Sequence, residues 1–167
     1  MKEMLLLQAN FNQKANLAMF EVLKNLSQND LDKDCGTFYK SVKTELCHLI
    51  GVNVAVFGGV FAKWANVDCS EILGEINADL SVKNDDLNAL KELCAKCDEK
   101  IIEITKNCAE LEKIDELSFP GITFKKTRAN LILAILNHSL HHRAVIGAEL
   151  DILGVKNDFN GMLGYEL

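Results

Sequence analysis

The sequence predicts an all-α protein that folds as a four-helix bundle. Hydrophobic residues make up 49% of the chain, aromatic residues only 7%, and Pro120 is the one proline. A β-sandwich or barrel would need many more turn residues, so this composition favours helices. Four long segments also repeat apolar residues at spacings of three and four, without internal sequence repeats. A chain of 167 residues forms one domain with a sizeable core, so residues 1–167 are assigned to a single domain.

The first half of the chain contains two of the predicted helices. The first is expected over residues 2–26 and ends at the polar stretch SQNDLDKDCG. Its apolar stripe consists of Leu5, Ala9, Ala15, Ala18, Val22 and Leu26. The second helix is expected over residues 38–66. The stretch NVDCSEILGEINADLSVKN then forms a long connection that contains one short helix.

The second half begins with a capping signal, since Asn84, Asp85 and Asp86 are good N-terminal caps for a third helix. The apolar positions of this helix alternate at spacings of three and four, as in a core-facing bundle helix. They are Leu87, Leu90, Cys94, Cys97, Ile101, Ile104, Cys108 and Leu111.

The stretch LSFPGITFKKTR interrupts the helical pattern with a turn signal at Pro120-Gly121. Residues 122–126 therefore belong either to a small hairpin or to an extended loop. Thr127 is a suitable cap for the last helix, which is expected to run to about Leu153 and to stop at Gly154.

Charge and cysteine content restrict the classes of function. The net charge of −6 argues against nucleic-acid binding, which requires a basic surface. No secretory signal is recognised, because polar residues interrupt the apolar run near the N-terminus. The six cysteines are therefore expected to be reduced thiols in a cytoplasmic protein. The pair Cys94 and Cys97 resembles a redox or zinc motif, but it falls on the core stripe, and packing is the favoured role.

One apolar segment, residues 46–62, imitates a membrane span. Its length is at the lower limit for crossing a bilayer, and it contains His48 and Asn53. We expect a buried helix and no membrane insertion. Because this helix is apolar on two sides, one side is expected to face the bundle and the other a second subunit. The sequence thus predicts a homodimer that uses the first two helices.

Three of the four histidines lie in the stretch NHSLHHR, residues 137–143. A helix turns by about 100° per residue, which places His138 and His142 on the core-facing stripe and His141 at its edge. Two imidazoles four residues apart on one helix can share a metal ion. The alternative is a pair of structural core histidines, but each ring would then need polar partners for both nitrogens. His48 lies on a face of small residues, Gly51, Val52, Ala55, Gly59 and Ala62, which would admit a neighbouring helix.

The chain resembles the DinB/YfiT family of small four-helix-bundle proteins, which are regarded as metal-dependent enzymes. The resemblance rests on NFNQKANLAMFEVLKNL, on DKDCGTFYKSVKTELCHLIGVNVAVF and on NHSLHHRAVIGAELDILG, in that order. It implies that His48, His138 and His142 bind a divalent metal, that a long crossover joins helices 2 and 3, and that the protein is a homodimer. The chain departs from the family pattern at Ala144 and Val145, where Gly-Gln is common, and at Asn53, where Asp is common.

A site of three neutral histidines leaves a coordination position open, as in catalytic zinc sites. Zinc and nickel both suit imidazole ligands. The candidates for hydrogen-bond partners around the ligands are Glu45, one turn from His48, and Asn137 and Ser139. Glu149 lies two turns beyond His142, too far to be a ligand. It either lines the pocket or faces solvent at the helix end.

Three functions follow as hypotheses. The first is a metal-dependent enzyme acting on a small molecule, as a thiol transferase or a hydrolase, because the resemblance includes thiol-dependent transferases. The second is a non-catalytic metal-binding protein of the stress response. The third is a helical dimer with structural histidines.

Overall fold

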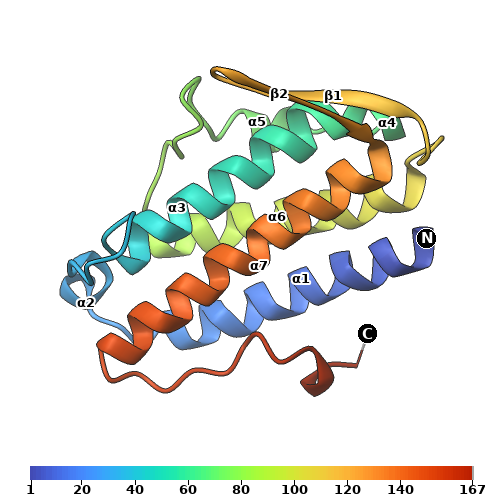
Figure 1. Cartoon of the computed structure of the whole chain (residues 1–167). Helices are drawn as coiled ribbons and strands as arrows, with labels where there is room; N and C mark the ends of the chain where they lie inside the picture. The colour runs from blue at the N-terminus through green and yellow to red at the C-terminus, as the bar shows by residue number, and fades with distance from the viewer. Residues whose placement is uncertain (167) are drawn as a thin grey trace.

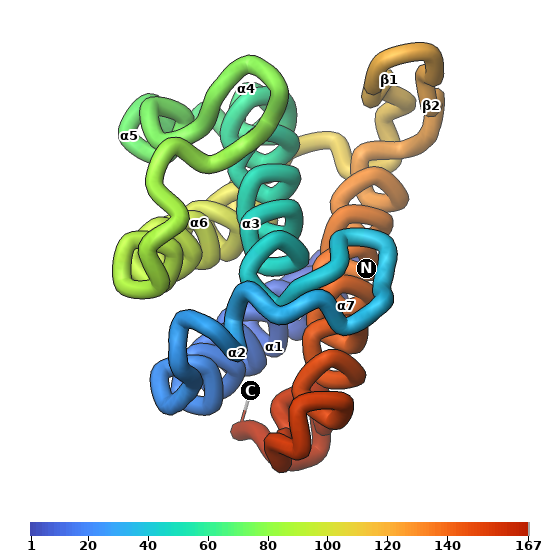
Figure 2. Tube along the Cα trace, turned by 90° about the vertical axis from the view of Figure 1, so that its left-hand side faces the viewer, coloured from blue at the N-terminus to red at the C-terminus, as the bar shows by residue number. Residues whose placement is uncertain are grey.

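The computed structural model describes residues 1–166, and it is mostly helical with a small two-stranded antiparallel sheet (Figure 1). Long helical segments lie side by side along most of the molecule (Figures 1 and 2). Helix α1 (Lys2–Leu23) packs against α6 (Leu87–Asn107) and α7 (Arg128–Ile152). Helix α3 (Val42–Asn53) packs against α7 and α6, so the core forms between these elements.

The polar stretch after α1 contains a short helix that the sequence pattern did not indicate. Helix α1 ends at Leu23, three residues before the predicted end at 26. Ser27 then accepts a hydrogen bond from the Asp30 backbone N–H, and the Asp30 carboxylate accepts one from the Ser27 N–H. This capping box starts helix α2 (Gln28–Asp32).

The second long helical segment begins at Val42, and the predicted start at residue 38 was wrong. Ser41 is its N-cap, and the residue before it, Lys40, has a φ of +73°, which interrupts any earlier helix. Beyond α3 the helix widens into a π-helix, η1 (Val54–Phe61), and then tightens again as α4 (Ala62–Ala65). Asn66 ends the segment in the left-handed conformation.

The connection 66–84 covers the small-residue side of this helix. A Cβ on Gly51 would lie 2.1 Å from the carbonyl oxygen of Leu80, and one on Gly58 would touch Cys69 and Leu73. Leu73 belongs to the short helix α5 (Ser70–Leu73), as expected for this connection. The chain itself therefore covers one of the two apolar sides of this helix, of which one was expected to face a second subunit.

The segment Val42–Ala65 is long and apolar enough to cross a membrane by length and composition. However, 72% of its most apolar eighteen-residue window is buried inside the protein. This is consistent with the core helix of a soluble protein.

The second half follows the predicted pattern closely. Asp86 caps α6 by accepting hydrogen bonds from the backbone N–H groups of Asn88 and Ala89. Cys94 and Cys97 are buried in the core, and all six cysteines are free. Of the two alternatives for the following segment, the hairpin is observed: β1 (Ile114–Phe119) pairs with β2 (Ile122–Thr127). Thr127 caps α7 as predicted, and the chain turns at Gly154 with a φ of +75°.

A buried polar cluster joins α1, α6 and α7, and the sequence analysis did not anticipate it. Arg143 on α7 donates hydrogen bonds to the side-chain carbonyls of Asn12 and Asn16 on α1. The amide groups of the same asparagines donate to Asp98 on α6, at 2.7 Å and 2.9 Å. Asp98 and Arg143 are 2% and 1% exposed. Burial raises the pKa of Asp98 to about 6 and lowers that of Arg143 to about 10. The two asparagines thus connect two buried ionisable groups that would each be costly alone.

We expect Asp98→Ala to lower the free energy of unfolding by about 3–5 kcal/mol, because it leaves the buried Arg143 without its counter-charge. Urea denaturation followed by circular dichroism measures this loss. The control is Glu99→Ala, an exposed neighbour on the same helix, which should change stability by at most ~0.5 kcal/mol. Equal effects of the two substitutions would show that the cluster contributes little.

Candidate metal centre

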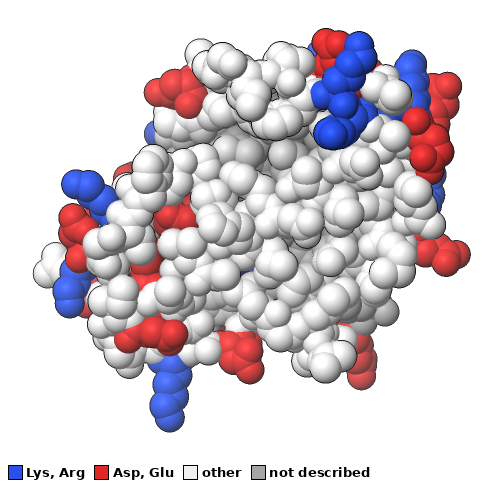
Figure 3. Space-filling view, in the orientation of Figure 1, with Lys and Arg blue, Asp and Glu red and all other residues white. Residues whose placement is uncertain are grey.

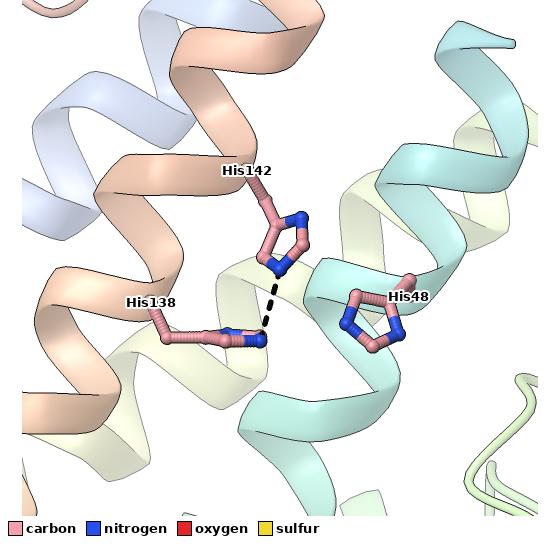
Figure 4. A group of neighbouring side chains, drawn as sticks. All are labelled: His48, His138 and His142. Carbon is pink, nitrogen blue, oxygen red and sulfur yellow. Dashed lines mark hydrogen bonds between the residues drawn. The ribbon is translucent and has the colours of Figure 1, made fainter. Parts of the chain in front are cut away.

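Three histidines from two neighbouring helices converge at one point (Figure 4). His48 comes from α3, whereas His138 and His142 come from successive turns of α7. One ring nitrogen from each lies within 4.8 Å of the others, and the Nε2 atoms of His138 and His142 are 2.9 Å apart. His141 is exposed on the outside of α7. The helix-face analysis therefore selected the two histidines of α7 that meet His48.

Glu45 contacts a different histidine from the one beside it in sequence. It lies one turn before His48 on α3, yet its Oε1 atom is 2.5 Å from Nδ1 of His142 on α7. The Glu45 side chain is buried, and its Oε2 atom has no partner among the described residues. This contact turns the Nε2 atom of His142 towards the other two histidines.

The other two candidate partners do not contact the histidine cluster. The Ser139 hydroxyl donates to Oδ1 of Asn53 at 2.9 Å and to the backbone carbonyl of Ile135. Asn137 is exposed. Ser139 therefore links α7 to Asn53 of α3, the position at which the family often has aspartate.

Tyr39 covers one side of the cluster, a contact that we did not predict from the sequence. Its ring stacks on His48 with centroids 4.2 Å apart, and its hydroxyl lies 3.1 Å from Nε2 of His48. The ring also meets His142 edge-on at 5.9 Å. Tyr39 belongs to the loop between α2 and α3, whose path depends on the left-handed Lys40 and on backbone hydrogen bonds. The sequence carried no signal for this path beyond the nearness of Tyr39 to the start of α3.

Glu149 is buried, so of the two alternatives for this residue, solvent exposure at the helix end is excluded. Its Oε1 atom accepts a hydrogen bond from the Thr37 hydroxyl at 2.6 Å, while Oε2 has no partner among the described residues. Burial raises the pKa of Glu149, and the nearby Glu45 carboxylate raises it further. The loop that carries Tyr39 is thus tied to α7 through Thr37.

The electrostatic setting keeps the three imidazoles neutral. Burial, with repulsion from neighbouring imidazoles, lowers the pKa of His48, His138 and His142 to about 4 each. Neutral rings present nitrogen lone pairs at pH 7, as metal coordination requires. Burial also raises the pKa of Glu45.

The histidine cluster fits a divalent metal ion. Nitrogen ligands of tetrahedral zinc lie about 2.0–2.1 Å from the ion and hence about 3.3 Å from each other. The 2.9 Å separation of His138 and His142 is close to this value, and small shifts would bring in His48. The Nε2 atoms of His138 and His142 face each other, and a metal ion between them would be bound by both lone pairs. Nδ1 of His138 is buried without a partner among the described residues, and a metal bound at Nε2 would leave it so.

A family model for the DinB family matches residues 1–164. The chain belongs to the DinB family. No curated protein sequence and no solved structure shows a significant match to it. The resemblance noted in the sequence is therefore confirmed, and it covers almost the whole chain.

The departures from the DinB pattern lie mostly outside the cluster. Ala144 is exposed and Val145 half-buried. Asn53 is buried and bonded to Ser139. The substitutions leave the three-histidine arrangement intact.

We expect the stability of the metal-free protein to fall as the pH is lowered from about 6.5 to about 4. The unfolded histidines take up protons below their ordinary pKa of 6.5, whereas the folded ones stay neutral down to about 4. Protons therefore favour the unfolded state across this window. Chemical denaturation in the presence of a chelator, repeated at several pH values, measures the slope.

His138→Gln should reduce the change of unfolding free energy with pH. It removes one of the three histidines whose pKa differs between the folded and the unfolded protein. His141→Gln, at an exposed position of the same helix, should retain the full slope. The raised pKa of Asp98 has the opposite effect, because it favours the folded state at low pH. This contribution is the same in the wild type and in both histidine variants. Identical slopes for the wild type and His138→Gln would contradict the prediction.

Proposed function

We propose that the protein is a divalent-metal-dependent enzyme that acts on a small molecule, as a thiol transferase or hydrolase. The observation that carries the proposal is the convergence of three neutral imidazoles, from α3 and α7, in a buried setting. His48, His138 and His142 would hold the ion, with zinc and nickel as the favoured metals. Three protein ligands leave room for a substrate or a water molecule, as in catalytic sites.

When bound, a divalent ion would act as a Lewis acid that favours the thiolate form of a thiol or polarises a substrate oxygen. The protein supplies the surroundings for that chemistry. The Tyr39 ring shields His48 from one side, and its hydroxyl is a hydrogen-bond donor next to the cluster. A thiol or an oxygen atom of the substrate, held near the histidines, would lie within reach of this phenol.

Glu45 would fix the tautomer of His142. For Nε2 of His142 to offer a lone pair to the metal, its hydrogen must sit on Nδ1, the atom that faces Glu45 at 2.5 Å. The carboxylate form of Glu45 accepts that hydrogen. The pair then forms a carboxylate–histidine–metal arrangement, which strengthens the histidine as a ligand.

The thiol chemistry rests on family membership together with the open position of a three-histidine site. A role as a metal-binding protein of the stress response without catalysis uses the same three ligands. Turnover distinguishes the two functions.

To test the function, the metal-loaded protein is incubated with a set of small thiols and electrophiles, and thiol consumption is measured alongside metal content. We expect about one divalent ion per chain and catalysed thiol loss above the uncatalysed rate. His142→Ala and His138→Ala should lose most of the metal and all of the catalysis, because two ligands are insufficient.

His141→Ala is the matched control, since it removes an exposed imidazole of the same motif. It should retain both metal and activity. Equal metal loss from His141→Ala would show that a different pair of histidines binds the ion. A full metal load without turnover for any thiol would favour the non-catalytic function.

We infer further that the protein is one domain over residues 1–167, a four-helix bundle of the DinB type in the cytoplasm, with 66–84 as the crossover. The packing of α1, α3, α6 and α7 against one another supports the bundle. The free cysteines support a reducing compartment.

We retain the homodimer as a prediction on family grounds, and expect light scattering at micromolar concentration to give twice the chain mass. The chain itself covers the small-residue side of the second helix, so any dimer contact on that side would be made by the connection 66–84. A mass equal to one chain would contradict the dimer.

A further inference from the structure

An apolar cavity of about 350 Å³ lies between the β-hairpin and the first turns of α7. Figure 3 shows this face of the molecule, on which charged side chains lie mainly at the margin and the surface is hollowed below the hairpin. The cavity walls are apolar and come from both elements. They are formed by Leu117, Phe119, Phe124, Leu131, Ala134 and Ile135. A volume of this size is at the lower end of the range for ligand pockets, roughly 300–1,000 Å³.

The cavity lies next to the histidine cluster along α7. Ile135 precedes His138 by three residues, a rise of about 4.5 Å along the helix. Leu131, Ile135 and His138 also lie on the same stripe of α7. The cavity and His138 are therefore about one turn apart along α7.

A second cavity of about 320 Å³ lies on the other side of strand β1. It shares Leu117 and Phe119 with the first cavity, and its helical wall comes from residues 55–60 of η1, which continues the helix that bears His48. The hairpin thus bridges the space between the two histidine-bearing helices, and β1 divides the hollow beneath it. Hydrophobic side chains on this strand contact both compartments.

The lining indicates the chemistry of the ligand. The rings of Phe119 and Phe124 meet edge-on at 6.4 Å, so the wall suits a planar aromatic group. The polar residues of the lining are Lys126 and Asn130. Lys126 is exposed and makes no ion pair within residues 1–166, because its cross-strand neighbour Asp115 binds Arg128 at 2.7 Å. A free ammonium beside an apolar wall favours a ligand with an anionic group.

We propose that this cavity binds an aromatic small molecule that carries an anionic group, with the ring packed against Phe119, Phe124 and Ala134 and the anion at Lys126. Burial of the ring against these side chains supplies the affinity, and Lys126 supplies the preference for negative charge. The binding itself does not depend on a metal. That the bound molecule is the second substrate of the neighbouring centre, and hence an aromatic electrophile or ester, rests on the proposed function.

The test uses two fluorescent probes that differ by one charged group. The anionic probe is 1-anilinonaphthalene-8-sulfonate, and the neutral probe is N-phenyl-1-naphthylamine. Ala134→Leu fills the cavity from an exposed position where a larger side chain is compatible with the helix. It should weaken binding of both probes by about tenfold or more. The matched control, Ala148→Leu, enlarges another exposed alanine of α7 away from the cavity and should leave both affinities unchanged.

Lys126→Glu tests the charge preference. It should weaken binding of the anionic probe by about tenfold while the neutral probe binds as before. Unchanged binding of both probes to Ala134→Leu would overturn the cavity as a binding site. Equal effects of Lys126→Glu on both probes would overturn the anionic ligand class. A probe that binds but is displaced only by apolar peptides, and by no aromatic acid, would identify the hollow as a peptide-docking surface and overturn the proposal.

Metal content is measured for each variant. A variant that loses the probe but keeps the metal shows that the cavity and the centre are separate sites. Conversely, normal probe binding by a protein that takes up no metal would refute the proposed function and leave the cavity assignment standing.

Discussion

The need to satisfy buried polar groups on α7 determines how the rest of the chain packs. Among the buried ionisable side chains of this helix, His142, Arg143 and Glu149 each find a partner on a different element. His142 contacts Glu45 on α3, Arg143 contacts asparagines on α1, and Glu149 contacts Thr37 in the loop before α3. An unpaired polar group in such a setting costs several kcal/mol, on the order of 1–3 or more. Any shift of a neighbouring element along α7 would break one of these contacts.

At the histidine cluster this requirement is only partly met, because some buried polar atoms lack a partner among the described residues. Nδ1 of His138 and one oxygen each of Glu45 and Glu149 are buried without partners among the described residues. In contrast, the Asp98–Arg143 cluster uses its asparagines to satisfy both charges. The molecule therefore contains one polar cluster whose charges are satisfied internally and one whose buried polar atoms are not all satisfied within the described residues.

The sequence sufficed for those parts of the fold and site that depend on local pattern. The spacing of His138 and His142 assigned them to the inner face of α7, and the structure brings them to His48. Thr127 and Asp86 were recognised as caps because capping depends on neighbours along the chain. Contacts between segments that lie far apart along the chain could not be predicted from the sequence. Glu45 is one turn from His48 in sequence, yet geometry across the helices pairs it with His142. Tyr39 fell within the helix predicted over residues 38–66, and neither it nor Asp98 was singled out, since nothing local shows what a fold will place beside them.

The π-helix that follows Asn53 separates two parts of one helix that serve different purposes. A π-turn accommodates one residue more than an α-turn, so the stretch 54–61 can gain or lose a residue by changing its winding. Such a length change would leave Glu45 and His48 in place, because both precede it. Deletion of one residue between Glu45 and His48, in contrast, would rotate the His48 imidazole by about 100° relative to Glu45. A one-residue change of length in this stretch would therefore alter the end of the helix that faces the hairpin and leave the histidine-bearing end in place.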